Sequence, residues 1–254
     1  SMAVIGIMSA MHEELAAVLA AMPDEQRVQV AGRDFWVGHW QGHSVVAVLS
    51  RIGKVAAATT ATVLLERFAA DTLVFTGVAG GLGADVRVGD VVVAQGLLQH
   101  DMDASPLFPR HEVPLYGRAH FEADAGLSAQ LAAASQQVLA HAGQHLGAGT
   151  LAEFALNAPR VHQGLVISGD RFVSTSAESQ ALRQALPEAL AVEMEGAAVA
   201  QVCHDYGVPF AAVRTISDRA DDAAHTDFQR FIREVASRYS LAILSQWLSR
   251  RQPA

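Results

Sequence analysis

The sequence predicts a single α/β domain that spans residues 1–254. Short apolar runs rich in β-branched residues alternate along the chain with segments in which apolar residues recur at helical spacing. No internal repeat, linker or low-complexity tract interrupts this alternation. With 254 residues, 51% of them hydrophobic, the chain is long enough to bury a sizeable core within one unit.

The bulk composition argues against several classes of function. A formal net charge of −8 disfavours a nucleic-acid partner, because binding phosphates requires a basic face. No apolar run approaches the ~20 residues that cross a bilayer, and no signal peptide is visible, so we expect a cytoplasmic protein without a membrane partner. The single cysteine, Cys203, excludes an internal disulfide and fits a reducing compartment. Because Cys203 falls in an apolar helical pattern, we interpret it as a core residue.

The chain begins with the pattern strand, helix, hairpin, helix. Residues 3–8 form a short β-branched run, and a helix is expected from about residue 11 to 21. Glu14 stands at this strand-to-helix junction, where a carboxylate can point into a ligand crevice. The segments that follow are two strands joined by a polar turn, 34–40 and 44–49, and an alanine-rich helix, 54–68.

A glycine cluster, Gly77–Gly83, follows the next expected strand, 73–76. Such a cluster lets the backbone approach a ligand closely. It lacks the dinucleotide-binding spacing and no Gly-Lys-Ser/Thr follows it, so neither a Rossmann fold nor a P-loop is indicated. Residues 86–94 are interpreted as a bent or bulged strand pair. The segment His100–Asp103 resembles a metal cluster, but without a second pair of ligands we favour structural hydrogen bonds and expect no metal or other cofactor.

The second half of the chain continues the alternation. Three prolines between residues 106 and 116 predict a surface loop or lid. Apolar residues at helical spacing predict a helix over 127–139, and the glycine-rich segment 142–149 predicts a loop. A strand is expected at 161–169, and a C-terminal helix from Phe228 through Tyr239.

Two carboxylates, Glu193 and Glu195, flank Met194 inside an otherwise apolar stretch. Charged side chains are rarely buried unless they are paired. Gly196 begins a helical pattern that continues to Gly207, a suitable C-terminal stop. Both acids therefore precede a helix, whose N-terminal dipole stabilises negative charge. Spacing alone leaves open whether they only occupy the helix start or serve a binding site.

A third acid, Asp218, ends the buried strand 208–218. The last residues of this strand turn polar, with Arg214 and Ser217 preceding Asp218. In open α/β sheets the ligand crevice lies outside the carboxyl ends of the strands, so this strand delivers polar groups to that place. A helix cap at Ser217 or Asp218 is the alternative interpretation.

Seven short motifs are spread over nearly the whole chain, in the same order as in one known family. Together they resemble the methylthioadenosine/S-adenosylhomocysteine nucleosidases, within the purine nucleoside phosphorylase-like superfamily. No single motif is decisive, but the combination is highly specific. The motifs are SAMHEE at 9–14, IGK at 52–54, TGVAGGL at 76–82, VGD at 88–90, SGDRF at 168–172, VEME at 192–195 and ISD at 216–218.

The resemblance implies a three-layer α/β/α fold around a central mixed, partly barrel-like sheet. It also implies a homodimer that binds a small-molecule purine nucleoside. The implied reaction uses water as co-substrate and releases adenine from a 5′-thio-substituted ribose, as in methionine salvage.

The same resemblance assigns roles to the three acids. Asp218 matches the general acid that protonates adenine at N7, a role that requires a raised pKa. Glu195 matches the residue that hydrogen-bonds the ribose hydroxyls, and its charge favours the oxocarbenium-like transition state. Glu14 matches the base that activates the attacking water. This division parallels that of glycosidases, in which two carboxyl groups act on opposite sides of the sugar.

Further matches are binding residues. Phe172 is expected to stack on adenine while the backbone of Val173 hydrogen-bonds its edge, and Met194 to pack against the ribose. Ser217 is expected to orient Asp218. The remaining substrate-binding candidates are Gly80 and Val78 in the glycine-rich motif, Met11 and Ile52 in the 5′ pocket, and Phe228, which covers the site from the loop after Asp218.

For Met11, Ile52 and Phe228, packing in the core is the alternative interpretation, since apolar residues are usually inside. Leu107 or Phe108 is a candidate to reach into the partner subunit's site.

Two departures from the family pattern bear on the substrate. Val78 stands where the nucleosidases commonly have serine, so one hydroxyl is missing, and residues 142–159 form a longer region than the family pattern predicts. The alternative that this protein is a divergent relative acting on another purine nucleoside, such as futalosine or its 6-amino analogue, therefore stays open.

Two other functions compete with hydrolysis. A phosphorylase of the same fold would need room for phosphate, which a carboxylate at Glu14 repels by about 1 kcal/mol at ~4 Å even in water. A nucleoside-binding protein would not need three acids to hold a neutral nucleoside.

Overall fold

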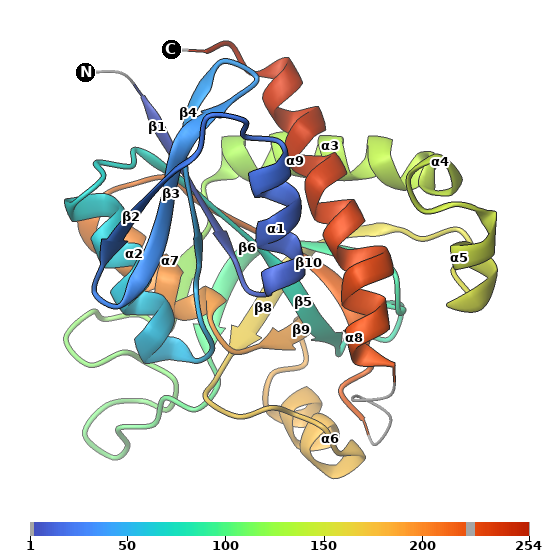
Figure 1. The fold of residues 1–254 in the computed structure, drawn as a ribbon. Coiled ribbons are helices and arrows are strands. Elements are labelled where there is room, and N and C mark those ends of the chain that lie inside the picture. The colour runs from blue at the N-terminus through green and yellow to red at the C-terminus, as the bar shows by residue number, and fades with distance from the viewer. Residues whose placement is uncertain (1–2, 222–226, 254) are drawn as a thin grey trace.

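The computed structural model describes residues 3–221 and 227–253. Within them a ten-stranded mixed sheet is covered by helices on both faces (Figure 1). The strands are β1 (Val4–Ser9), β2 (Gln26–Val30), β3 (Arg33–Trp40), β4 (His43–Leu49), β5 (Thr72–Gly81), β6 (Val91–Gln99), β7 (His120–Glu122), β8 (Val161–Ser168), β9 (Ala189–Glu193) and β10 (Phe210–Asp218). The helices are α1 (His12–Ala20), α2 (Lys54–Glu66), α3 (Ala125–Ala140), α4 (Ala142–Leu146), α5 (Ala148–Glu153), α6 (Ser176–Ala185), α7 (Gly196–Tyr206), α8 (Phe228–Phe231), the π-helical turn η1 (Ile232–Ala236) and α9 (Ser237–Arg250).

Part of the sheet closes on itself. β5 pairs with β10, β10 with β6, β6 with β8, β8 with β9, and β9 returns to β5 through Gly80 and Gly81. From β5 the sheet also extends as an open arm in the order β1, β4, β3, β2. This combination of a five-strand ring and an arm confirms the mixed, partly barrel-like sheet.

Two apolar layers cover the faces of the sheet. On one face, α1, α3 and α9 pack through residues such as Val18, Leu131 and Trp247. On the other face, α2 and α7 pack through residues such as Leu64 and Val199 (Figure 1). The layers confirm the α/β/α arrangement, and no described helix is long and apolar enough to cross a membrane.

Several elements differ from the expectations. Residues 142–149 are not a loop, because Ala142 and Leu146 lie one turn apart and bury together, so that α4 forms and α5 follows after Gly147. Residues 86–94 are not a strand pair: a turn precedes β6, and the irregularity falls in β6 itself, between Ala94 and Gly96. The C-terminal helix is broken by η1 and continues to Arg250.

Three elements have no counterpart in the sequence prediction. β2 is a largely polar edge strand and β7 has three residues, so neither shows an apolar period. α6 is mostly polar, but its start carries a capping-box signal. The Thr175 hydroxyl oxygen accepts a hydrogen bond from the backbone N–H of Glu178 at 3.2 Å and donates to the Glu178 side chain at 2.9 Å.

Candidate active site

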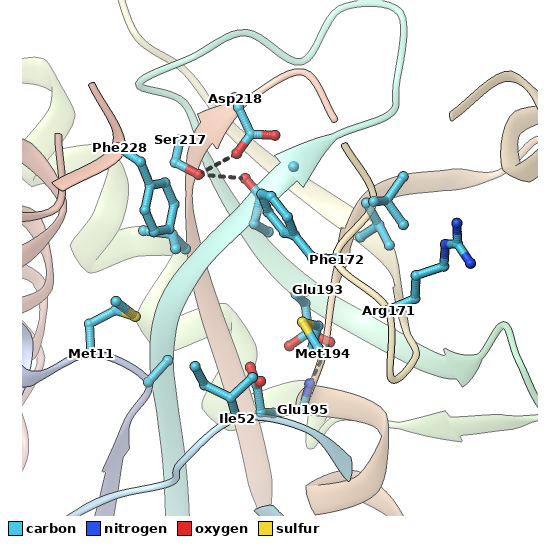
Figure 2. Close-up of a pocket in the computed structure, with 16 residues that line it drawn as sticks. Met11, Ile52, Arg171, Phe172, Glu193, Met194, Glu195, Ser217, Asp218 and Phe228 are labelled. Atoms are coloured by element: carbon cyan, nitrogen blue, oxygen red, sulfur yellow. Dashed lines mark hydrogen bonds between the residues drawn. The ribbon is translucent and has the colours of Figure 1, made fainter. Parts of the chain in front are cut away.

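A cavity of about 400 Å³ opens where β5, β9 and β10 end. Eleven of the twelve candidate site residues line this cavity, and the exception is Glu14. Figure 2 shows Ser217 and Asp218 at one end of it and Glu195 with Ile52 at the other, and we call these the Asp218 end and the Glu195 end. The lining residues are Ala10, Met11, Ile52, Val78, Ala79, Gly80, Arg171, Phe172, Val173, Val192, Glu193, Met194, Glu195, Ser217, Asp218 and Phe228.

At the Asp218 end, a break in the strand register positions the carboxyl group. The pairing of β10 with β5 shifts between Ile216 and Asp218, which turns the last residue of the strand relative to the ladder. The Ser217 hydroxyl donates to Asp218 Oδ2 at 2.8 Å, and the backbone N–H of Ala220 donates to Oδ1 at 2.7 Å. A Cβ on Gly80 would lie 3.0 Å from Asp218 Oδ1 and 2.8 Å from the Ala220 Cβ, so only glycine lets these segments pack this closely.

Burial raises the pKa of Asp218 above its ordinary value, against the opposing effect of the hydrogen bonds from Ser217 and Ala220. The side chain is 8% exposed, and no ion pair to it occurs among the described residues. The Asp218 end therefore favours a carboxyl group that keeps its proton.

At the Glu195 end, the two neighbouring acids have different environments. Glu193 accepts hydrogen bonds from the backbone N–H of Gly196, at 2.8 Å, and from the Ser168 hydroxyl, and it pairs with Arg214. It thus binds the N-terminus of α7, as the helix-start interpretation predicts. Glu195 makes no cap hydrogen bond with its side chain and instead accepts from the backbone N–H of Gly53 at 3.1 Å.

Burial raises the pKa of Glu195, the neighbouring charge of Arg214 lowers it, and the charge of Glu193 raises it further. Glu195 is 5% exposed, and its Oε1 lies 3.6 Å from Arg214 Nη2. Of the two acids, Glu195 is the one left available to a ligand.

Arg214 was not among the candidate residues, yet it organises the Glu195 end. Its side chain is fully buried, forms an ion pair with Glu193, and lies with its guanidinium carbon 4.1 Å from the centre of the Phe75 ring. A Cβ on Gly77 would collide with the guanidinium, so the glycine cluster here makes room for Arg214. The sequence carried the signal, because an arginine inside a buried strand requires an acidic partner.

Glu14 does not line the cavity and is fully buried. The Ser240 hydroxyl donates to Glu14 Oε2 at 2.6 Å, whereas Oε1 has no hydrogen-bond partner among the described residues. Burial raises the pKa of Glu14 to about 7, although the Ser240 hydrogen bond and the charge of Arg214 act in the opposite direction. The hydroxyls of Ser9 and Thr76, which are paired residues of β1 and β5, likewise lack a hydrogen-bond partner among the described residues.

The apolar candidates form the walls and rim of the cavity. Phe172 and Phe228 flank the Asp218 end, while Met11 and Met194 lie toward the Glu195 end (Figure 2). Ile52 is 66% exposed, which rules out the core-packing interpretation for this residue. Phe228 is the first residue of α8, not part of a loop.

In the segment His100–Asp103, which resembles a metal cluster in sequence, Asp101 makes structural hydrogen bonds. Asp101 accepts a hydrogen bond from Lys54 Nζ at 2.7 Å and another from the backbone N–H of Asp170 at 2.9 Å. These bonds tie the start of α2 to the loop that carries Phe172.

The family model of the phosphorylase superfamily matches residues 4–246. The chain belongs to the phosphorylase superfamily. Solved structures agree with this assignment, including a 5′-methylthioadenosine/S-adenosylhomocysteine nucleosidase from Neisseria meningitidis in complex with methylthio-immucillin-A. It is 32% identical, with a TM-score of 0.84, over 96% of this chain and 98% of that one.

Two further structures show the range of relatives. An S-adenosylhomocysteine nucleosidase from Streptococcus pyogenes is 35% identical, with a TM-score of 0.82, over 99% of this chain and 98% of that one. A futalosine hydrolase from Helicobacter pylori is 30% identical, with a TM-score of 0.84, over 98% of this chain and 99% of that one. The resemblance inferred from the seven motifs is thereby confirmed.

Proposed function

We propose that this protein is a purine nucleosidase that hydrolyses the N-glycosidic bond of 5′-thio-substituted adenine nucleosides, such as methylthioadenosine and S-adenosylhomocysteine. One observation carries the proposal. A single cavity places the carboxyl group of Asp218, whose pKa is raised by burial, opposite a charged group of Glu193, Glu195 and Arg214. The similar nucleosidases from Neisseria meningitidis and Streptococcus pyogenes share this fold over nearly their whole length.

The Asp218 end is proposed to bind adenine. Phe172 and Phe228 offer aromatic faces for the base, and Val173 supplies backbone beside it. As the bond between C1′ and N9 breaks, its electron pair moves onto the purine. Asp218 donates its proton to N7, so adenine leaves as a neutral base, and the Ser217 hydrogen bond keeps the carboxyl group oriented.

The Glu195 end is proposed to bind the ribose. Glu195 accepts hydrogen bonds from the ribose hydroxyls, and Met194 packs against the sugar. Three carboxyl groups, on Glu14, Glu193 and Glu195, lie near one guanidinium, that of Arg214. When they are ionised, this end carries a net negative charge, which stabilises the positive charge that develops on the ribose.

Glu14 is proposed to act as the general base. Its Oε1, which is buried without a hydrogen-bond partner among the described residues, is proposed to hydrogen-bond the attacking water, and a pKa of about 7 suits a base near neutral pH. Glu14 accepts one proton from this water as the oxygen bonds to C1′, so the products are adenine and the free thioribose. A buried carboxylate at this place repels phosphate, which disfavours phosphorolysis.

A second candidate substrate class has an observation in its favour. Val78 lines the cavity with an apolar side chain where serine is common in the nucleosidases, and a futalosine hydrolase is among the similar structures. A purine nucleoside such as futalosine or its 6-amino analogue is therefore the alternative substrate.

Product analysis tests both parts of the proposal. Methylthioadenosine, S-adenosylhomocysteine, adenosine, inosine and aminodeoxyfutalosine are incubated with the protein, with and without phosphate. We expect adenine and free thioribose from the first two, at rates that phosphate does not change. A sugar 1-phosphate as the main product contradicts the hydrolase proposal, and faster turnover of aminodeoxyfutalosine selects the alternative substrate.

A cytoplasmic homodimer is part of the same proposal. Several large apolar side chains are exposed at or just before the start of α2 and on the proline-rich loop: Ile52, Val55, Leu107 and Leu115 are 66–92% exposed. A second copy would bury them, and it would bring the loop that carries Leu107 toward a neighbouring cavity. Light scattering of the wild type and of Val55→Glu tests this, with a dimer expected for the first and a shift toward monomer for the second.

A further inference from the structure

A closed ring of hydrogen bonds joins Lys54, Asp101 and Asp170. Lys54 Nζ donates to Asp101 Oδ1 at 2.7 Å, and the backbone N–H of Asp170 donates to Asp101 Oδ2 at 2.9 Å. The backbone N–H of Lys54 donates to Asp170 Oδ1 at 2.7 Å, which closes the ring. The three residues lie far apart in sequence, at the start of α2, after β6 and after β8. The ring therefore fixes these three segments relative to one another.

Asp101 contributes both of its carboxylate oxygens to the ring. Burial opposes its ionisation, but the hydrogen bonds from Lys54 and Asp170 and the charge of Lys54 lower the pKa of Asp101. The carboxylate is therefore charged at neutral pH, and hydrogen bonds to a charged group are stronger than neutral ones. Lys54 Nζ has a second acceptor, Gln99 Oε1 at 3.0 Å, so the start of α2 stays tied to β6 even without Asp101.

The ring adjoins both ends of the cavity. Phe172, which lines the cavity, follows Asp170 by two residues. Gly53, which directly precedes α2, donates its backbone N–H to Glu195 Oε2 at 3.1 Å. Gly53 has a φ of 97°, and a Cβ there would lie 3.3 Å from Asp170 Oδ1, so glycine lets the two segments approach each other.

The backbone that carries Phe172 lies at the surface. Residues 170–172 are exposed, with Phe172 itself 49% exposed, and a helix begins again only with α6. Val173, on one side of Phe172, is buried, and Asp170, on the other side, is held by the ring. The position of the Phe172 ring therefore depends on the hydrogen bonds of Asp170.

We propose that Asp101 is a positioning residue of the nucleosidase, which holds the backbone of Asp170 and thereby presents Phe172 to the base. Without Asp101 the substrate itself must order this loop, which lowers affinity and leaves the chemical step unchanged. The inference rests on the proposed function, because it requires the base to lie against Phe172. It extends that function by adding a residue that takes no part in the proton transfers and sets the affinity for the nucleoside.

The test is a double-mutant cycle that combines Asp101→Ala with Phe172→Ala and measures KM and kcat for methylthioadenosine. Asp101→Ala alone is expected to raise KM about 10-fold, the effect of one charge-assisted hydrogen bond, and to change kcat less than about threefold. Phe172→Ala alone is also expected to raise KM, because a base–aromatic stack is lost. Together they are expected to raise KM little more than Phe172→Ala alone, since a misplaced ring has no stacking left to lose.

A second variant and the melting temperatures guard against misfolding. Asp170→Ala breaks the same ring at a different bond and is expected to reproduce the rise in KM and its dependence on Phe172. Asp124→Ala is the matched control, because Asp124 also accepts a backbone N–H bond, from Leu127 at 2.8 Å, but caps α3, which contributes no residue to the cavity lining. In the Asp124→Ala background, Phe172→Ala must keep its full effect on KM.

Glu195→Gln must likewise keep its effect in the Asp101→Ala background, because Gln99 still holds Lys54. Effects of Asp101→Ala and Phe172→Ala on KM that simply multiply, or a kcat that falls as much as KM rises, reject the inference. Turnover of methylthioadenosine by the wild type then leaves the proposed function standing. Failure of the wild type to hydrolyse methylthioadenosine rejects the proposed function and this inference with it.

Discussion

The two ends of the cavity both bury carboxyl groups but surround them differently. Asp218 has neutral hydrogen-bond donors, Ser217 and the backbone N–H of Ala220, and no ion pair among the described residues. Glu195 shares the buried guanidinium of Arg214 with Glu193. Burial raises the pKa of both acids, but only neutral hydrogen-bond donors oppose this at Asp218, whereas at Glu195 the charge of Arg214 favours the ionised form.

This difference indicates which end supplies which part of catalysis. A glycosidic bond to adenine breaks heterolytically, so one side of the bond needs a proton and the other needs negative charge. The Asp218 end fits the first requirement and the Glu195 end the second. The predictions below change one end at a time.

The largest effect is expected from Asp218→Asn. Asparagine preserves size and can still hydrogen-bond N7, but it cannot deliver a proton. We expect kcat to fall by roughly 10²–10⁴-fold, as is typical for loss of a general acid, with KM and the melting temperature little changed. Steady-state kinetics and thermal unfolding measure this. Unchanged turnover with a small stability change is what a mere helix cap predicts, since Asp and Asn cap about equally well.

The second effect is on stability and comes from Arg214→Met. Removing the cation leaves Glu193 and Glu195 buried without a counter-charge, which typically costs ~3–5 kcal/mol of unfolding free energy. Urea unfolding measures the loss, and Arg67→Met serves as the surface control. Adding Glu193→Gln to Arg214→Met is expected to recover part of it. A loss below about 1 kcal/mol contradicts the role of Arg214 as the centre of this end.

Glu195→Gln is expected to reduce kcat/KM by roughly 10²-fold, because a neutral amide cannot stabilise the developing cation as a carboxylate does. The fold is expected to survive, since the amide oxygen can still accept the hydrogen bond from Gly53. Full activity in this variant assigns Glu195 to the helix start alone.

The smallest effect concerns Glu14 and pH. Its pKa is about 7 in the folded protein and near 4.5 when unfolded, so the folded state binds the extra proton between these values and stability falls as pH rises through this window. Glu14→Gln lacks this penalty. The free energy of unfolding of Glu14→Gln, relative to that of the wild type, is therefore expected to rise by on the order of 2 kcal/mol between pH 5 and pH 8.

Urea unfolding at both pH values measures the gain, and Glu25→Gln, half-buried and outside the site, is the control. A difference between Glu14→Gln and the wild type that does not change with pH contradicts burial as the cause of the raised pKa.

Most of the cavity was predictable because strand ends converge at one edge of the sheet. Ser217 and Asp218 end β10 where the sequence predicted. Gly80 came from the motif resemblance instead, because the expected strand ended at residue 76 whereas β5 continues to Gly81. What separates Glu193 from Glu195 was not predictable. The distinction depends on contacts with Ser168, Gly53 and Arg214, which lie far away in sequence.

Two other features that the sequence prediction missed do have recognisable signals in the sequence. Arg214 could have been found from the rule that a buried charge requires a partner, and α6 from its capping box. The burial of Glu14 outside the cavity lining depends on how α9 places Ser240 against α1, and no local pattern encodes that packing. The assignments of Glu14, Glu195 and Asp218 to chemical roles stay predictions until the variants are measured.

The most direct test of the central claim measures kcat for the wild type, Asp218→Asn and Glu195→Gln on two nucleosides. One nucleoside carries adenine, and the other carries a leaving group that departs without protonation. If the Asp218 end supplies the proton and the Glu195 end supplies the charge, Asp218→Asn loses activity on the adenine nucleoside only, whereas Glu195→Gln loses it on both. Equal losses for Asp218→Asn on the two substrates contradict the division of labour between the two ends.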